Sequence, residues 1–112
     1  MARIKIEIPD NFIFSTELIA QIGDVNYGGH VGNDKFLLYA QETRVRFLRK
    51  YQLSELNIGE ETGLIMTDSA IVYKSEVFAG DEILVELAVQ DISKAGFDFV
   101  YLFKNKKTGK DL

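Results

Sequence analysis

The 112-residue sequence predicts an α+β domain in which one long helix precedes an antiparallel sheet. Three observations lead to this prediction. Apolar residues alternate before residue 22, a helical spacing of apolar residues runs from about 35 to 51, and three strand-like segments follow with hairpin-length connections. The length lies near the commonest domain size, so we expect a single domain over residues 1–112.

Two strands are expected before the first loop. Ile4, Ile6 and Ile8 alternate with charged residues, which is typical of a half-buried strand, and Pro9 ends this pattern. A second extended run covers residues 12–22. Its apolar face carries Phe14, Leu18, Ala20 and Ile22.

The longest expected element is a helix that begins after Asn33 and Asp34, which are good N-cap residues, and ends near Tyr51. Helical spacing gives it a buried stripe of Phe36, Ala40, Phe47 and Tyr51, flanked by Leu37, Arg44 and Leu48. Leu38 and Val45 lie on the opposite side, beside Glu42. Because the helix is apolar on two sides, we expect it to pack on two sides.

Three strands are expected after the helix, over residues 64–77, 82–93 and 97–104. Gly80 and Gly96 stand in the two connecting turns, where a positive φ is expected. The middle segment alternates and faces a core through Ile83, Val85, Leu87 and Val89. The final turn predicts a returning strand, but the sequence contains only the first residues of such a strand. That strand is therefore expected to be missing, because it never existed or because the chain is shortened.

Composition excludes several classes of function. The net charge of −4 and the pI of about 5.0 disfavour nucleic-acid binding. The absence of Cys and the single His exclude thiolate chemistry and ordinary metal centres, and no cofactor-binding motif is present. No apolar run is long enough to span a membrane, and the N-terminus has no signal-peptide pattern. The expected location is the cytoplasm, with no cofactor, nucleic acid or membrane involved.

Chemistry is concentrated in residues 24–34, which read DVNYGGHVGND. Taken singly, His30 is most simply a loop or capping residue, and paired glycines are most simply a turn. Taken together, Gly28 and Gly29 allow the backbone to approach a ligand closely. The N–H groups at the start of the following helix point the same way, with the positive end of the helix dipole behind them. This combination predicts an oxyanion site.

Residues 23–44 resemble the signature of hotdog-fold acyl-CoA thioesterases of the 4-hydroxybenzoyl-CoA thioesterase type. The stretch that carries the resemblance reads GDVNYGGHVGNDKFLLYAQETR. The matching positions are Gly23, Asp24, Gly29, His30, Val31, Asn33, Phe36, Leu37, Tyr39, Glu42 and Arg44. Residues 77–110 are also similar to the strands and Gly-Asp turn of this family, so the resemblance covers about residue 12 to the C-terminus.

The resemblance implies a long central helix wrapped by an antiparallel sheet, and a dimer or tetramer with active sites between protomers. Many members carry a catalytic Asp where this chain has Asn26, which cannot act as a general base. Other branches place the acid on the central helix, where Glu42 is the candidate, acting from a second subunit. The implied catalytic residues are Asn26, His30 and Glu42. The implied substrate-binding residues are Asp24, Gly28, Gly29 and Asn33.

The predicted function is hydrolysis of the thioester of an acyl-CoA or an acyl carrier. The alternative is a non-catalytic hotdog module that binds acyl-CoA or regulates a partner, which the Asn at position 26 supports. A hotdog dehydratase is a third reading, for which the sequence offers no strong match. The acyl chain, the choice between CoA and carrier protein, and the choice between dimer and tetramer stay open at the level of sequence.

Overall fold

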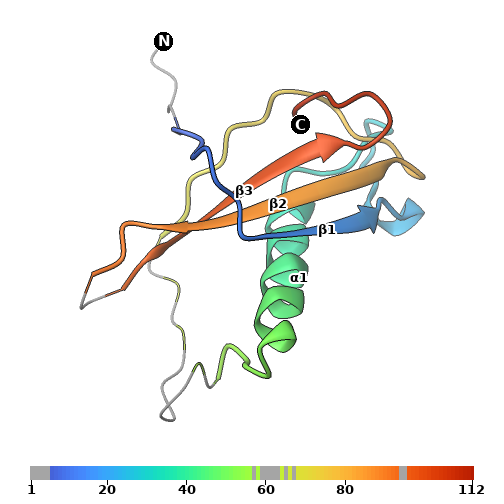
Figure 1. Ribbon diagram of the computed structural model, residues 1–112. Helices are drawn as coiled ribbons and strands as arrows, with labels where there is room; N and C mark the ends of the chain where they lie inside the picture. The colour runs from blue at the N-terminus through green and yellow to red at the C-terminus, as the bar shows by residue number, and fades with distance from the viewer. Residues whose placement is uncertain (1–5, 57, 59–63, 65, 67, 94–95) are drawn as a thin grey trace.

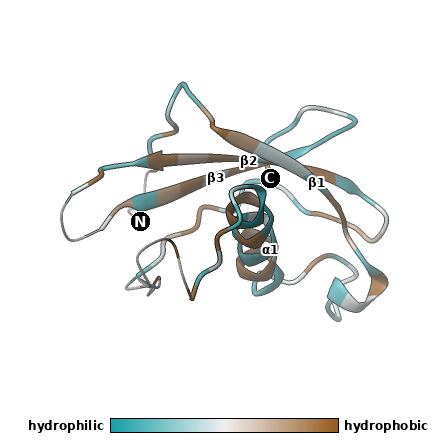
Figure 2. Ribbon diagram, turned by 60° about the horizontal axis from the view of Figure 1, so that its bottom comes forward, coloured by the Kyte–Doolittle hydropathy of each residue, from teal (hydrophilic) through white to brown (hydrophobic). Residues whose placement is uncertain are grey.

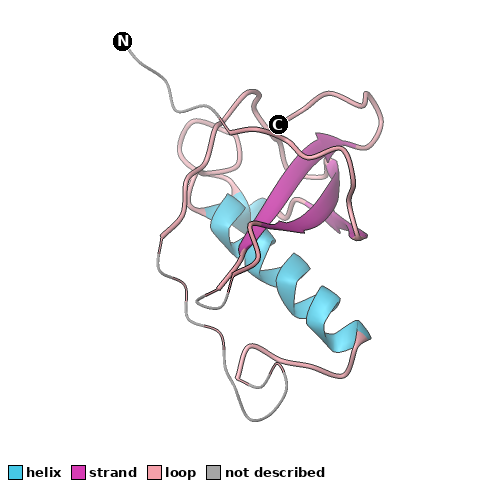
Figure 3. Cartoon of the chain, turned by 60° about the vertical axis from the view of Figure 1, so that its left-hand side comes forward, coloured by secondary structure: helices cyan, strands magenta, loops and turns pink. Residues whose placement is uncertain are grey.

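The computed structural model describes residues 6–56, 58, 64, 66, 68–93 and 96–112. Its elements are β1 (Phe14–Ile19), the 3₁₀ turn η1 (Ile22–Asp24), α1 (Lys35–Lys50), β2 (Glu82–Gln90) and β3 (Asp98–Asn105). The strands form one antiparallel sheet in the order β1-β2-β3, and α1 lies against one face of it (Figures 1 and 3). The α+β class expected from the sequence is confirmed.

The face of the sheet that meets α1 carries the core. Strand register places Phe14 opposite Leu87, and Leu87 opposite Tyr101, so apolar side chains line up across all three strands. The alternation predicted for β2 is confirmed at Ile83, Val85 and Leu87, which are completely buried. Figure 2 shows this arrangement from the side, with the largely apolar strands β2 and β3 lying over the helix.

The helix has nearly the predicted bounds, with Asp34 as N-cap and Tyr51 as C-cap. The predicted stripe is correct at Phe36, Ala40 and Leu48, all buried, and wrong at Tyr51, which is 55% exposed, and at Leu37, which is also exposed. Tyr51 fails because it stands after the last helical residue. The stripe also extends to the other side of Phe36, where Tyr39 and Thr43 are buried. A pattern of apolar residues cannot reveal Thr43, because Thr is polar. Its hydroxyl donates to the Tyr39 carbonyl at 2.9 Å, so the hydroxyl has a hydrogen-bond partner inside the core.

Aromatic rings fill the space between the helix and the sheet. Successive ring centroids lie 5.5 to 6.4 Å apart from the Phe14–Phe47 pair through Phe99 and Tyr101 to Phe103 and Phe36. Most of these pairs meet edge to face or tilted, which is the favourable geometry for aromatic rings. This packing fixes the start of α1, where Phe36 sits, against β3.

In two predicted strands, the residues that the structure describes form no strand. Residues 6–8 belong to no strand, and residues 1–5 lie outside the described part of the chain. In the predicted segment 64–77, residues 64, 66 and 68–77 form no strand, and 65 and 67 lie outside the described residues. Val77 nevertheless accepts a 2.6 Å hydrogen bond from the N–H of Val31. The segment is therefore held by the loop before α1 instead of by the sheet.

Three smaller predictions about turns have mixed outcomes. Gly80 has the expected positive φ of 90°, whereas Gly96 does not, and Asp91 adopts a positive φ of 53° in that connection instead. Ile22 lies in η1 and is almost fully exposed, so its assignment to the apolar face of the first strand was wrong. After the final turn, the N–H of Leu112 donates to the Phe103 carbonyl at 2.9 Å, so the chain does turn back along β3.

Candidate functional site

The loop between η1 and α1 folds into a narrow hairpin. Val25 and Val31 form an isolated antiparallel bridge. Beside it, the N–H of Asn26 donates to the His30 carbonyl at 2.9 Å, and the N–H of Gly32 donates to the Asp24 carbonyl at 3.1 Å. With the bond from Val31 to the 64–77 segment described above, these contacts fix the loop at the N-terminal end of the helix.

Gly28 brings two of the predicted site residues together. A Cβ atom at this position would lie 3.2 Å from Asn26 Oδ1 and 3.3 Å from His30 Nε2, so the amide and the imidazole ring both press against it. Gly29 has a φ of +83°, which residues with a side chain rarely adopt. Gly29 is therefore required by its backbone conformation, a side chain at position 28 would have to displace Asn26 or His30, and the structure places these two residues next to each other.

The two glycine amides are not available to a ligand in this conformation. The N–H of Gly28 donates to Asn26 Oδ1 at 2.8 Å, and the N–H of Gly29 donates to the Asn26 carbonyl at 3.1 Å. Among the described residues, none accepts a hydrogen bond from the N–H of His30 or from that of Asn33. The Gly29 N–H expected to serve as an oxyanion donor is therefore occupied, whereas the N–H groups of His30 and Asn33 are unpaired among the described residues.

Asp24 joins the loop to the helix. Its Oδ2 accepts hydrogen bonds from the Tyr39 hydroxyl at 2.8 Å and from the N–H of Gln21 at 3.0 Å. Burial raises the pKa of Tyr39 well above its usual value of about 10, and the hydrogen bond to Asp24 raises it further. The sequence assigned Asp24 to substrate binding. That role stays a prediction, and in this structure the Asp24 carboxylate connects the loop to α1 through Tyr39.

Tyr39→Phe should lower the free energy of unfolding at pH 7 by about 1.5–3 kcal/mol, because it removes a hydrogen bond to a carboxylate and keeps the ring. Because the folded pKa of Tyr39 is raised, its contribution is complete below about pH 10 and decreases as the pH rises above that value. Urea unfolding at pH 7 and between pH 9 and 11 should show a smaller alkaline loss in the variant than in the wild type. Tyr27→Phe is the matched control, since Tyr27 is fully exposed and should change neither value.

A hollow of about 230 Å³ opens at the start of α1, beside this loop. We call it the His30 hollow, and its wall includes His30, Asn33, Phe36, Tyr73 and Ser75. Phe36 and Tyr73 meet edge to face at 5.6 Å, and the Tyr73 hydroxyl donates to the Asn33 carbonyl at 3.0 Å. His30 Nδ1 lies 3.2 Å from the Val31 carbonyl oxygen. In the tautomer that donates this bond, Nε2 is free to accept a proton or a hydrogen bond.

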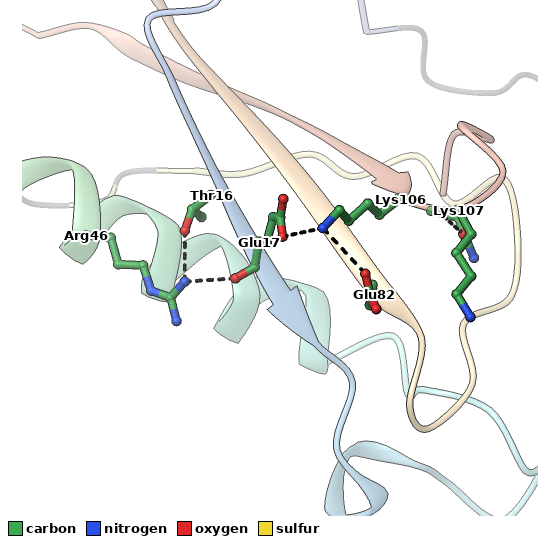
Figure 4. Close-up of polar contacts among 7 residues, drawn as sticks. Thr16, Glu17, Arg46, Glu82, Lys106 and Lys107 are labelled. Carbon is green, nitrogen blue, oxygen red and sulfur yellow. Dashed lines mark hydrogen bonds and ion pairs between the residues drawn. The ribbon is translucent and has the colours of Figure 1, made fainter.

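Glu42 does not belong to the His30 hollow of its own chain. It lies seven residues after the first residue of α1, which is about 10 Å along the helix axis, and its side chain is exposed. Its carboxylate pairs with Arg46 at 3.3 Å. Arg46 in turn donates to the Thr16 hydroxyl and the Glu17 carbonyl of β1 (Figure 4). The outward position predicted for Glu42 is confirmed, and the structure separates it from the other site residues.

Ion pairs of Lys106 connect β1, the edge strand that contains Glu17, to its neighbours. Lys106 contacts Glu17 at 2.8 Å and Glu82 at 3.6 Å, linking β1 and β2 to the turn after β3 (Figure 4). All three side chains are exposed, so these pairs contribute little stability individually. Across the described residues, no group of three His, Asp or Glu side chains is arranged to hold a metal ion.

Sequence reasoning missed Tyr39, Tyr73 and Ser75. The contact of Tyr39 with Asp24 spans fifteen positions, and that of Tyr73 with Asn33 spans forty, so no local pattern reveals either. For Tyr39 the sequence offered two signals, its match to the family signature and its position one turn after Phe36 on α1.

Residues 20–112 match the family model of the thioesterase-like superfamily. The chain belongs to this superfamily. Among curated proteins, none matches the chain in sequence. Within the part of the chain that is described, no helix is long and apolar enough to cross a bilayer.

Several solved structures share the fold. A 1,4-dihydroxy-2-naphthoyl-CoA thioesterase from Synechocystis is 24% identical with a TM-score of 0.80, over 88% of this chain and 74% of that one. A hypothetical protein from Aquifex aeolicus is 20% identical with a TM-score of 0.72, over 88% and 90%. A probable thioesterase from Bartonella henselae is 14% identical with a TM-score of 0.75, over 91% and 82%. The helix and its antiparallel sheet form a hotdog fold, as the sequence resemblance implied.

Proposed function

We propose that this protein hydrolyses the thioester bond of an acyl-CoA or acyl-carrier substrate in the His30 hollow. The observation that carries the proposal is the meeting of Asn26 and His30 at Gly28, in a loop before α1 whose His30 and Asn33 N–H groups are unpaired among the described residues. Membership of the thioesterase-like superfamily supports the reaction type. The CoA thioester acted on by the Synechocystis structural relative supports the substrate class.

In the proposed reaction, the thioester carbonyl oxygen accepts hydrogen bonds from the N–H groups of His30 and Asn33. The positive end of the α1 dipole stabilises the negative charge that develops on this oxygen. The oxygen of a water molecule bonds to the carbonyl carbon, the carbon–sulfur bond breaks, and a proton from the water ends on the departing thiolate. Asn26 orients the water or the substrate, and Nε2 of His30 hydrogen-bonds the reacting carbonyl group or the water.

Glu42 from a second copy of the chain acts in this proposal as the base that accepts the proton of the water, or as a nucleophile. In the second route its oxygen bonds to the carbonyl carbon, the thiolate departs, and water then hydrolyses the resulting anhydride to release the acid and regenerate Glu42. Within one chain, Glu42 is two helical turns from the hollow and faces outward. Leu38 also projects outward from α1 and is 52% exposed, which supports a subunit contact along this side of the helix. A homodimer or homotetramer would therefore complete the site.

A panel assay of thiol release tests the proposal. Purified protein is mixed with short, long and aromatic acyl-CoAs, and the free thiol is followed by a chromogenic disulfide reagent. The chain itself has no Cys, so it adds no background signal. We expect at least one substrate with a kcat/KM of about 10⁴ M⁻¹s⁻¹ or more, the lower end of the usual enzyme range. Turnover of none of them would contradict the proposal.

The second candidate is a non-catalytic module that binds acyl-CoA. It is favoured by one observation, namely that the family's usual acidic position holds Asn26, whose oxygen caps the N–H of Gly28. The same panel separates the two candidates when each acyl-CoA is also titrated by calorimetry. Binding without turnover across the panel identifies the module, whereas binding with turnover identifies the enzyme.

A further inference from the structure

Ser75 carries a buried hydroxyl that the fold does not use. Its Oγ is buried and, within the described part of the chain, has no hydrogen-bond partner. Among the described residues, no other buried side-chain nitrogen or oxygen lacks a hydrogen-bond partner. Ser75 stands in the wall of the His30 hollow, together with His30 and Asn33. An unpaired group of this kind is uncommon in folded proteins and needs an explanation.

Two neighbouring polar side chains of the hollow already have partners. The Tyr73 hydroxyl donates to the Asn33 carbonyl, and His30 Nδ1 contacts the Val31 carbonyl. Phe36 offers only an aromatic ring. Leaving a hydroxyl buried without a partner costs free energy that an alanine at the same position avoids. Ser75 therefore does not contribute to folding through its hydroxyl, and a bound molecule is the partner that this wall can receive.

We infer that Ser75 is a substrate-binding residue whose hydroxyl donates a hydrogen bond to the carbonyl oxygen of a bound thioester. The inference rests on the proposed function and adds a residue to that site. Rotation about χ1 moves the serine oxygen between three staggered positions without moving the backbone. In our proposal this rotation turns the buried hydroxyl toward the hollow, whose wall includes Ser75. There it would join the N–H groups of His30 and Asn33 around the carbonyl oxygen of the substrate.

Ser75→Ala tests this inference with two measurements whose expected directions are opposite. The kcat/KM for the best acyl-CoA should decrease at least tenfold, because a donor to the carbonyl is lost. The melting temperature should be equal to or higher than that of the wild type, because an unpaired buried hydroxyl is removed. Ser75→Cys, which keeps the size but is a weak donor, should give an intermediate rate. Ser69→Ala is the matched control, since Ser69 is exposed in the same segment and should change neither measurement.

The outcomes separate this inference from the proposed function. If the wild type hydrolyses thioesters and Ser75→Ala does so equally fast, the inference about Ser75 is overturned and the proposed function stands. A melting temperature clearly below that of the wild type would also overturn it, by showing that the hydroxyl is bonded in the fold. If the wild type hydrolyses no thioester, the proposed function fails. The inference is then decided by calorimetric titration with a CoA ketone analogue, in which a methylene replaces the sulfur. At least tenfold weaker binding to Ser75→Ala supports it, and equal binding overturns it.

Discussion

Glu42→Gln should lower kcat for thioester hydrolysis at least about a hundredfold, because the amide cannot accept a proton from the attacking water. The same change should leave the free energy of unfolding within about 0.5 kcal/mol of the wild type, since Glu42 is exposed and Arg46, at 3.3 Å, is its only ion-pair partner among the described residues. Steady-state kinetics on the best acyl-CoA and urea unfolding provide the two values. A rate loss without a stability loss is the signature of a chemical role.

Glu82→Gln is the control for Glu42→Gln. Glu82 is also an exposed carboxylate paired with an exposed cation, Lys106, and it lies on β2 away from the hollow. This variant should keep the wild-type rate. If Glu42→Gln keeps it as well, the helix carboxylate is not the base, and the proposed mechanism is wrong at that step.

A mixing experiment tests whether Glu42 acts across a subunit interface. Glu42→Gln and Asn26→Ala chains are inactive separately in our proposal. In a mixed dimer, one of the two sites receives an intact loop from one chain and an intact Glu42 from the other. Mixing the two variants should therefore restore a substantial fraction of the wild-type activity. Failure to restore any activity in verified mixed oligomers would contradict a shared site.

The parts of the fold that could be predicted are those in which the local sequence pattern is compatible with only one structure. In β2, alternation of Ile83, Val85 and Leu87 can bury one face only against a core, and these side chains are indeed fully buried. The helix was predictable from the apolar spacing after Asp34, although the Asp34 side chain makes no cap hydrogen bond. Residues 64–77 have an equally apolar pattern, but the pattern does not specify a partner. Val77 bonds to Val31 of the loop, and no strand is formed by the described residues of that segment.

The candidate site was predictable as a cluster but not as a set of hydrogen bonds. Residues 24–33 are contiguous, so their closeness followed from the sequence alone. Which N–H groups are free did not follow, because Asn26 accepts from both glycines through two different oxygens. The unpaired hydroxyl of Ser75 is likewise invisible in the sequence, since the lack of a partner depends on everything packed around it. The first feature depends on which local turn the loop adopts, since Asn side chains can bond to several nearby backbone groups. The second depends on tertiary packing around Ser75.

Asn26→Ala should lower kcat/KM at least about a hundredfold, for two reasons that act together. The variant loses the amide beside His30 Nε2 that orients the water or the substrate. It also loses the acceptor for the N–H of Gly28, which shapes the loop. Kinetics on the best acyl-CoA measure the total effect, and the temperature of unfolding measures the second part. A wild-type rate in this variant would remove Asn26 from the site.

Asn26→Asp separates the loss of the orienting amide from the loss of the acceptor for the N–H of Gly28. A carboxylate oxygen can still accept from the N–H of Gly28, so the loop should keep its shape and the protein its stability. The carboxylate also stands beside the His30 hollow, where it can accept a proton from water as the family's usual acidic residue would. The kcat/KM should then equal or exceed that of the wild type. Its pH profile should gain an acidic limb near the ordinary pKa of Asp, about 4. If Asn26→Asp is instead as slow as Asn26→Ala, the chain depends on the amide NH₂ as a donor, and its chemistry differs from that of relatives with Asp at this position.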